Sequence, residues 1–183
     1  MADRPPPVLN QLLVEELYTS TAHRLHNYVA RRVGATIADD IVAESFLILW
    51  RERAGQPCDA DAARAWLFGV ATNLVRRHAR DEERRLRAGI RDHRAESPPE
   101  DDFDRATAEL DSRALAGPLR RMLADLPTNQ RDVLMLVAWG DLTPSMAAAA
   151  LSIPEATARS RLHRARNRIK SSLNTYLKDR SHG

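Results

Sequence analysis

Apolar residues recur along most of this 183-residue chain at intervals of three and four positions. This spacing places them on one face of an α-helix, whereas a strand would need alternation at every second position. No stretch alternates convincingly, so the chain is expected to be all-α. We expect helices over residues 10–33 (one helix or two), 39–53, 63–88, 103–126, 129–141, 144–151 and from 155 onward.

A stretch rich in proline and acids, AESPPEDDFD, interrupts this pattern at about Ala95. It has little that can pack and is typical of a linker. The chain is therefore expected to contain two small helical domains joined by an acidic flexible linker. The predicted bounds are residues 10–94 for the first domain, 95–106 for the linker and 107–178 for the second domain.

The composition excludes several classes of protein. The lone cysteine, Cys58, rules out a disulfide framework or a cysteine-based metal site within the chain. The histidines form no recognisable metal motif, and we expect no catalytic residue, metal or cofactor. No signal core or apolar run of about 18 residues is present, which predicts a cytoplasmic protein with no membrane span.

Positive charge is unevenly distributed. The formal net charge is only +3, so the placement of the charges is more informative than their sum. Almost all the basic residues are arginines, and this choice favours bidentate recognition of phosphate or carboxylate. A GC-rich coding sequence would produce the same bias, and both interpretations remain open.

The second half of the chain carries a helix-turn-helix pattern. Thr143 suits the N-cap position of a short helix and Pro144 suits its first turn. Pro154 then forces a turn, and a second helix is expected from Glu155.

This second helix has two distinct faces. Ala158, Leu162, Ala165 and Ile169 form one packing stripe. The second helix of such a unit enters the major groove of DNA. A solvated surface would mix acids among the bases, but only Glu155 and Asp179 do so here. We therefore expect DNA binding by a polar face that consists of Thr157, Arg159, Ser160, Arg161, His163, Arg164 and Arg168, with Arg166 beside it.

Two helices of the first half also carry functional signals. The segment DDIVAESFLILW is apolar over most of its circumference, which indicates either a covering partner or a central bundle helix. The helix that follows is expected to pack through Trp66, Val70 and Leu74, while a polar ridge lies on its other side. Such a ridge suits single-stranded nucleic acid, although a core tryptophan beside a solvated basic helix is the better interpretation of Trp66 alone. The ridge consists of Asn73, Arg77, Arg80 and Arg84, with Arg76 and Arg87 beside it.

Three segments occur in a characteristic order: DDIVAESFLILWRER, ARAWLFGVATNLVRRHAR, and LADLPTNQRDVLMLVAWGDLTPSMAAAALSIPEATARSRLHRAR. In this order the chain resembles the extracytoplasmic-function (ECF) group of sigma-70-family transcription initiation factors over about residues 12–175. One departure is Ser152, which stands where the family usually has glycine. Others are Ala156 and Ala158, which flank Thr157 where the family has Gly-Thr-Val.

The resemblance implies a non-enzymatic factor that binds core RNA polymerase and promoter DNA, with no small-molecule substrate. It places the −10 contacts on the loop over residues 54–63 and on the helix from Ala65 to Arg84, and the −35 contacts on the helix from Glu155. Within the former helix we expect the ridge residues Asn73, Arg76, Arg77 and Arg80 to contact the −10 region. It also implies an anti-sigma partner. The residues expected to dock on the polymerase clamp helices are Asp39, Asp40, Ile41, Glu44, Phe46, Leu49 and Trp50.

Two alternatives remain at this point. One is a dimeric helix-turn-helix regulator that binds duplex operators without polymerase. The other is a sigma-like protein that binds polymerase but has lost promoter recognition.

Overall fold

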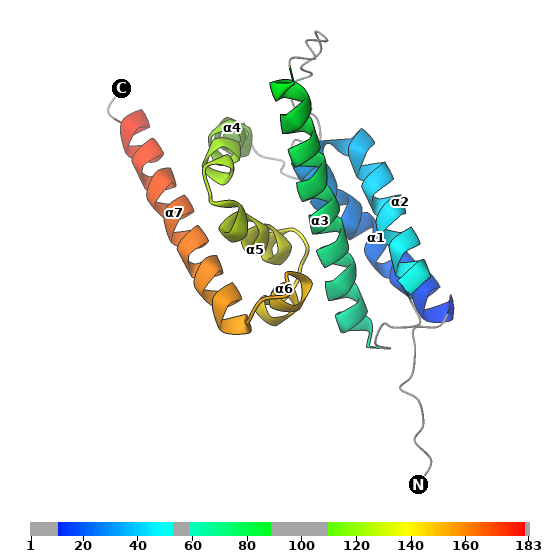
Figure 1. Cartoon of the computed structure of the whole chain (residues 1–183). Coiled ribbons are helices and arrows are strands. Elements are labelled where there is room, and N and C mark those ends of the chain that lie inside the picture. The colour runs from blue at the N-terminus through cyan, green and yellow to red at the C-terminus, as the bar shows by residue number, and fades with distance from the viewer. Residues whose placement is uncertain (1–10, 53–58, 89–109, 182–183) are drawn as a thin grey trace. The chain divides into compact units, whose positions relative to one another are not determined.

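The computed structural model describes residues 11–52, 59–88 and 110–181, and every regular element in these ranges is a helix (Figure 1). The chain forms two compact units, residues 1–98 and 99–183. The predicted all-α fold with two helical domains is confirmed. The predicted linker over residues 95–106 lies outside the described residues, and so do residues 54–58 of the loop expected to contact the −10 strand. Within the described part, no helix is long and apolar enough to cross a membrane.

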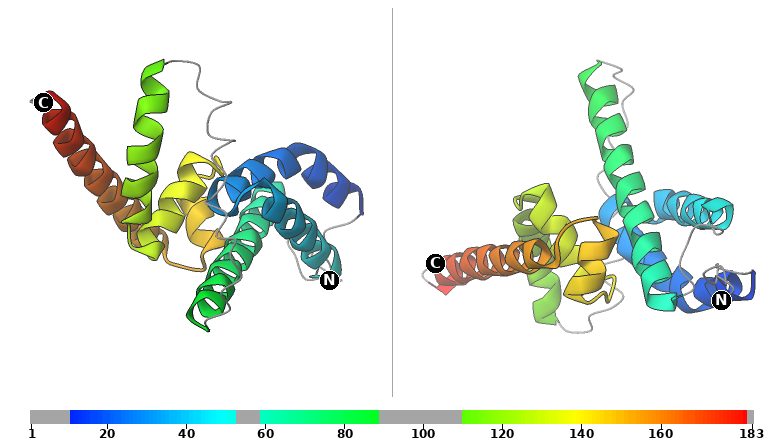
Figure 2. Two further views of the ribbon diagram at one scale, coloured as in Figure 1. Left: turned by 90° about the horizontal axis from the view of Figure 1, so that it is seen from above. Right: turned by 60° about the horizontal axis from the view of Figure 1, so that its bottom comes forward.

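In its described residues, unit 1 has three helices that all pack against one another: α1 (Gln11–Val33), α2 (Ala35–Glu52) and α3 (Ala60–Arg87) (Figures 1 and 2). The first agrees with the helix expected over residues 10–33. The other two begin earlier than the sequence suggested.

The helix starts in unit 1 are set by two local features. Gly34 has a left-handed backbone with φ 85°, and its N–H donates to the Ala30 carbonyl at 2.8 Å. Glycine adopts this conformation without steric cost, so α1 ends and α2 begins at the next residue. The expectation that α2 starts at Asp39 was therefore wrong. Likewise, the Asp59 carboxylate accepts from the Ala62 N–H at 3.0 Å, and this cap starts α3 at Ala60 instead of near Ala63.

The core of unit 1 is built around an aromatic pair. The rings of Tyr28 and Phe68 are both fully buried and meet edge to face, with centroids 5.4 Å apart. The Thr72 hydroxyl donates to the Phe68 carbonyl at 2.7 Å, so it accepts from the Tyr28 hydroxyl at 2.8 Å. Arg32 donates to the Tyr28 oxygen at 2.7 Å. This chain of hydrogen bonds gives each buried hydroxyl a partner and ties α1 to α3.

The described part of unit 2 has four helices, and α7 packs against the other three. Their bounds are α4 (Leu110–Ala124), α5 (Thr128–Ala138), α6 (Pro144–Ala150) and α7 (Glu155–Ser181). The last three agree closely with the expected helices. The first part of the helix expected over residues 103–126 lies outside the described residues.

The helix-turn-helix of unit 2 consists of α6 and α7, which lie side by side near the beginning of α7 (Figure 2). The predicted cap is confirmed, because the Thr143 hydroxyl accepts from the Met146 N–H at 3.1 Å. The turn passes through Ser152, whose φ is 52°. The core beneath it consists of small and medium residues: Val133, Ala148, Ala158 and Leu162. Alanines at two of these positions let the helices approach closely.

Candidate nucleic-acid and protein interfaces

The packing stripe predicted for α7 is confirmed. Ala158 and Ala165 have no exposed surface, Leu162 is buried, and Ile169 is half-buried. This stripe fixes which way the helix turns its polar face. Of the residues predicted to contact DNA, Thr157 and Arg161 are half-buried at the edge of that face. The others are exposed: Arg159, Ser160, His163, Arg164 and Arg168.

The polar face of α7 is organised by contacts one turn apart. Arg159 pairs with Glu155 at 2.5 Å. The Arg164 guanidinium donates to the Ser160 carbonyl at 3.2 Å and to its hydroxyl at 3.1 Å. The side-chain amide nitrogen of Asn167 lies 2.9 Å from the Nε2 ring nitrogen of His163. These contacts orient side chains along the helix without burying them.

Three further arginines of α7 lack such neutralisation. Arg161, Arg166 and Arg168 form no ion pair with a carboxylate among the residues that the structure describes. Their charge is therefore available to an anionic partner. An array of arginines without matching acids is the electrostatic footprint expected of a DNA-binding helix.

The ridge predicted on α3 is solvent-exposed. Asn73, Arg77 and Arg80 are exposed, and Arg76 is half-buried. Arg77 lies 3.9 Å from Asp81, which also pairs with Arg84.

The opposite face of α3 differs from the prediction. Trp66, Val70 and Leu74 are only half-buried, so the predicted packing stripe was wrong by one position. The buried row contains Leu67, Phe68, Ala71, Thr72 and Val75, with Ala63, Ala65 and Gly69. The row was missed because small residues make up much of it.

The residues predicted on α2 separate into two groups. Ile41 and Leu49 are buried in the core of unit 1, at 6% and 0% exposure. The expectation that Leu49 faces outward was therefore wrong, and neither side chain is placed to contact a partner. Phe46 is half-buried. Asp39, Asp40, Glu44 and Trp50 are exposed and share one face of the helix.

Sequence reasoning missed two exposed residues beside this face. Leu47 is 54% exposed on α2, and Tyr18 is 56% exposed on α1. The Tyr18 ring meets Phe46 edge to face with centroids 4.9 Å apart. Together with Val14 and Trp50 these aromatic rings line a cleft of about 350 Å³. The i, i+3 spacing of Leu47 and Trp50 was a signal that the sequence offered.

One polar contact links α1 to α2 at the edge of the same face. The His26 ring nitrogen lies 3.2 Å from the Asp39 carboxylate. Asp39 is 77% exposed, so the contact does not remove it from the surface.

The sequence matches two protein-family models, and each match lies within one unit. The model described as "Sigma-70 region 2" matches residues 17–85, and the model described as "Sigma-70, region 4" matches residues 116–169. The chain is also 32% identical to the ECF RNA polymerase sigma factor SigL of Mycobacterium tuberculosis over 162 residues. That match covers 88% of this chain and 89% of SigL. The chain is an ECF sigma factor of the sigma-70 family.

Other ECF sigma factors are similar over comparable lengths. SigC of M. tuberculosis is 30% identical over 165 residues, which are 87% of this chain and 83% of SigC. Two solved structures share the fold. One is CnrH in complex with the cytosolic domain of CnrY, with a TM-score of 0.60 at 22% identity, covering 91% of this chain and 90% of CnrH. The other is the sigma factor RpoE from Bartonella quintana in complex with the anti-sigma factor NepR. It has a TM-score of 0.62 at 20% identity, and the match covers 87% of this chain and 96% of RpoE.

Sigma factors are transcription initiation factors whose domains bind core RNA polymerase and promoter DNA. In this ECF sigma factor, the region 2 match contains the exposed face of α2 and the ridge of α3. The region 4 match contains the helix-turn-helix and the arginines of α7. Each candidate surface therefore lies inside a sigma-factor domain, and the dimeric operator-binding regulator is excluded as an alternative.

Proposed function

We propose that this ECF sigma factor acts as a non-enzymatic, cytoplasmic factor whose two units divide promoter recognition between them. Unit 1 binds core polymerase and the −10 element, and unit 2 binds the −35 element. The observation that carries the proposal is the similarity to SigL, which extends through both units. A protein that kept only polymerase binding would not need the unneutralised arginines of α7.

The polymerase surface that we propose is the exposed face of α2. It combines carboxylates at its beginning with exposed apolar side chains toward its end, as in an interface with an apolar centre and a polar rim. Ile41 and Leu49 belong to the core beneath it and are left out, and Leu47 is added. The proposed surface consists of Asp39, Asp40, Glu44, Phe46, Leu47 and Trp50.

The DNA surfaces that we propose lie on α3 and α7. On α3 they are Asn73, Arg76, Arg77 and Arg80, which would contact the melted −10 strand. On α7 they are Thr157, Arg159, Ser160, Arg161, His163, Arg164 and Arg168, which would contact the −35 element. The exposure of most of these side chains supports the assignment.

A substitution at Leu47 tests the polymerase surface. Leu47→Asp should weaken binding to core polymerase by about 2 kcal/mol or more, roughly 30-fold, because it places a charge in the apolar centre of the interface. The measurement is equilibrium affinity for core polymerase by fluorescence anisotropy, with helicity checked by circular dichroism.

The matched control is Leu86→Asp, which changes a leucine on α3 that is also exposed, at 67%, and lies outside the proposed surface. It should bind polymerase as the parent chain does. If Leu47→Asp, Trp50→Ala and the control all retained parental affinity, the proposed surface would be wrong. A variant that bound polymerase but started transcription at no promoter would favour the modulator instead.

We also propose a regulatory anti-sigma partner for this chain. The support is that CnrH and RpoE, which share its fold, were each solved with a partner protein, and that the partner of RpoE is an anti-sigma factor. The exposed rings of Tyr18 and Trp50 give such a partner apolar surface to cover. The test is affinity purification of the tagged chain from its host, followed by transcription assays with and without the co-purified protein. A partner that left transcription unchanged would contradict the proposal.

A further inference from the structure

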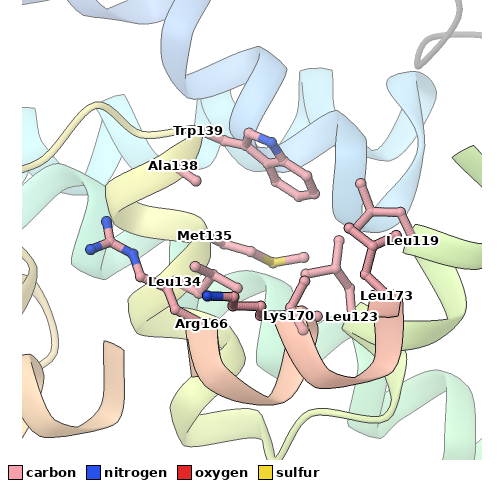
Figure 3. A pocket seen from close by; sticks show the side chains of 10 residues that line it. Leu119, Leu123, Leu134, Met135, Ala138, Trp139, Arg166, Lys170 and Leu173 are labelled. Atoms are coloured by element: carbon pink, nitrogen blue, oxygen red, sulfur yellow. The ribbon is translucent and has the colours of Figure 1, made fainter. Parts of the chain in front are cut away.

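Each unit has an apolar hollow, and the two hollows differ in charge. The groove of unit 2 lies between α4, α5 and α7, and two cations, Arg166 and Lys170, line it together with leucines and Trp139 (Figure 3). The cleft of unit 1 lies between α1 and α2 and has a volume of about 350 Å³. No cation is among the described residues that line this cleft, and the charged group among them is the Glu15 carboxylate. The cleft of unit 1 therefore favours a cationic occupant.

The walls of the unit 1 cleft are mainly aromatic. The chain has three tryptophans, three tyrosines and three phenylalanines, and one of each kind lines this cleft: Tyr18, Phe46 and Trp50. The planes of the Tyr18 and Phe46 rings are inclined to one another by 65°, and Trp50 is 39% exposed. The face of an aromatic ring carries the negative part of its quadrupole. Rings set at an angle can therefore attract one cation from more than one side.

The polar edge of the cleft indicates which cation fits. The Thr19 hydroxyl donates to the Glu15 carbonyl oxygen at 2.9 Å, so this hydroxyl is engaged within α1 and the Glu15 carboxylate supplies the charge. A guanidinium suits such a site better than an ammonium, because it is planar, stacks on aromatic rings and donates two parallel hydrogen bonds to a carboxylate. The aliphatic stem of an arginine also covers apolar surface, such as that of Val14.

We infer that this cleft receives an arginine side chain of core RNA polymerase. The inference rests on the proposed function, because the cleft adjoins the polymerase surface proposed on α2 and shares Phe46 and Trp50 with it. Interface hot spots are enriched in tryptophan, tyrosine and arginine, and they tend to pair with hot spots on the partner. The cleft therefore anchors the end of the α2 surface opposite Asp39 and Asp40. The anti-sigma partner proposed above would cover the same rings and so compete for the cleft.

The first test changes the charge on a ring face and nearly keeps the ring size. Tetrafluorotryptophan in place of Trp50 in the full chain should weaken binding to core polymerase about fivefold, because fluorine withdraws electron density from the face that attracts the cation. Tryptophans with fewer fluorines should have smaller effects in proportion. The same replacement at Trp66, which lies on α3 and does not line the cleft, is the control and should leave the affinity unchanged.

The second test concerns the carboxylate and the identity of the occupant. Glu15→Gln should also weaken polymerase binding about fivefold, because it removes a charge-assisted hydrogen bond. The matched control is Glu16→Gln, which makes the same charge change at the next position of α1, outside the cleft lining. In addition, p-azidophenylalanine in place of Phe46 should crosslink on illumination to a polymerase segment that contains an arginine, which mass spectrometry identifies. Circular dichroism checks that each variant keeps its helicity.

Three results would overturn the inference. Parental affinity of the fluorinated chain, with Trp50→Ala still weakened, would show that an apolar group occupies the cleft. A crosslinked segment without an arginine would assign a different occupant. Parental affinity of every cleft variant, with Leu47→Asp weakened, would place the cleft outside the interface and leave the polymerase surface of α2 in place. If Leu47→Asp bound as the parent does as well, the proposed surface would be wrong and the inference with it.

Discussion

The two basic helices of this sigma factor carry their arginines in different ways. Helix α3 has seven basic and four acidic residues, and α7 has eight basic and two acidic residues. The acids of α3 lie within reach of its arginines: besides the Asp81 pairs, Glu82 pairs with Arg85 at 3.6 Å and Glu83 with Arg87 at 2.5 Å. On α7 the corresponding contact is that of Glu155 with Arg159.

This difference indicates two modes of binding. A helix whose arginines are already paired with acids displaces few counterions from DNA. Its contribution to DNA affinity therefore depends on a few side chains and on shape complementarity. A helix with unneutralised arginines contributes strong, salt-dependent attraction in addition to any base contacts. On α3, Arg80 is exposed and forms no ion pair with the carboxylates described, so it is the arginine most available to a DNA strand.

The largest expected effect distinguishes recognition of the −35 bases by α7 from binding of the melted −10 strand by α3. Arg164→Ala should relax the base preference at one −35 position by about 1–3 kcal/mol, since a bidentate arginine–guanine contact is worth that much. Arg159→Ala and Arg161→Ala should act similarly at neighbouring positions. Arg80→Ala should weaken open-complex formation at all promoters alike, because phosphate contacts carry no sequence information. The measurement is transcription from libraries randomised across the −35 and −10 elements. Unchanged −35 selectivity in the α7 variants would show that these arginines contact phosphates and not bases.

A smaller effect concerns salt dependence. Arg168→Ala should lower the slope of log affinity against log salt by about 0.9, the value for one lost phosphate contact. Arg84→Ala, the matched change on α3, should leave the slope nearly unchanged because Asp81 already neutralises that side chain. Promoter binding by holoenzyme across a salt series measures both. Equal slopes for the two variants would remove the distinction between the helices.

The two units also differ at their tight turns. Left-handed backbone is occupied by Gly34 before α2 but by Ser152 before α7. A side chain costs about 1 kcal/mol or more in this conformation. Ser152→Gly should therefore stabilise the chain by up to about 1 kcal/mol, and Gly34→Ala should destabilise it by about as much. Urea unfolding measures both. A destabilised Ser152→Gly variant would show that the serine makes a compensating contact.

The smallest expected effect comes from removing an acid from α3. Asp81→Asn should release Arg77 and Arg84 and tighten promoter binding about two- to fivefold at low salt, which is the scale of exposed ion pairs. Asp179→Asn, near the end of α7 and away from the recognition face, is the control. Binding by the Asp81 variant at or below the parental level would argue that the ion pairs position the ridge productively.

Much of this architecture could be predicted from spacing and cap residues. The helix-turn-helix was predicted correctly because Thr143 and Pro154 fix its turns locally and because the stripe from Ala158 to Ile169 is unambiguous. The family resemblance supplied the division of roles between the surfaces, which no local pattern contains.

The wrong predictions concern side chains whose burial is decided by packing between helices. Leu49 was expected to face outward because α2 is apolar on most sides, and only the positions of α1 and α3 determine which side is covered. The stripe on α3 was misplaced because Ala71, Gly69 and Thr72 take part in the core although they carry little hydrophobicity. The groove beside Trp139 could not be predicted, since it depends on three helices that are distant in the sequence.

The length of α3 has a consequence of its own. Its buried residues end at Val75, and residues 76–87 extend about 18 Å further as a helix with no buried side chain. Among the described residues this segment adds no buried side chain to the core of unit 1, so ion pairs between neighbouring turns, each worth about 0.2–0.5 kcal/mol and weakened by salt, contribute to its helicity. We therefore expect the helicity of the end of α3 to fall as ionic strength rises. With the −10 contact proposed for this ridge, the ions that compete for the DNA would also loosen the helical surface that meets the melted strand.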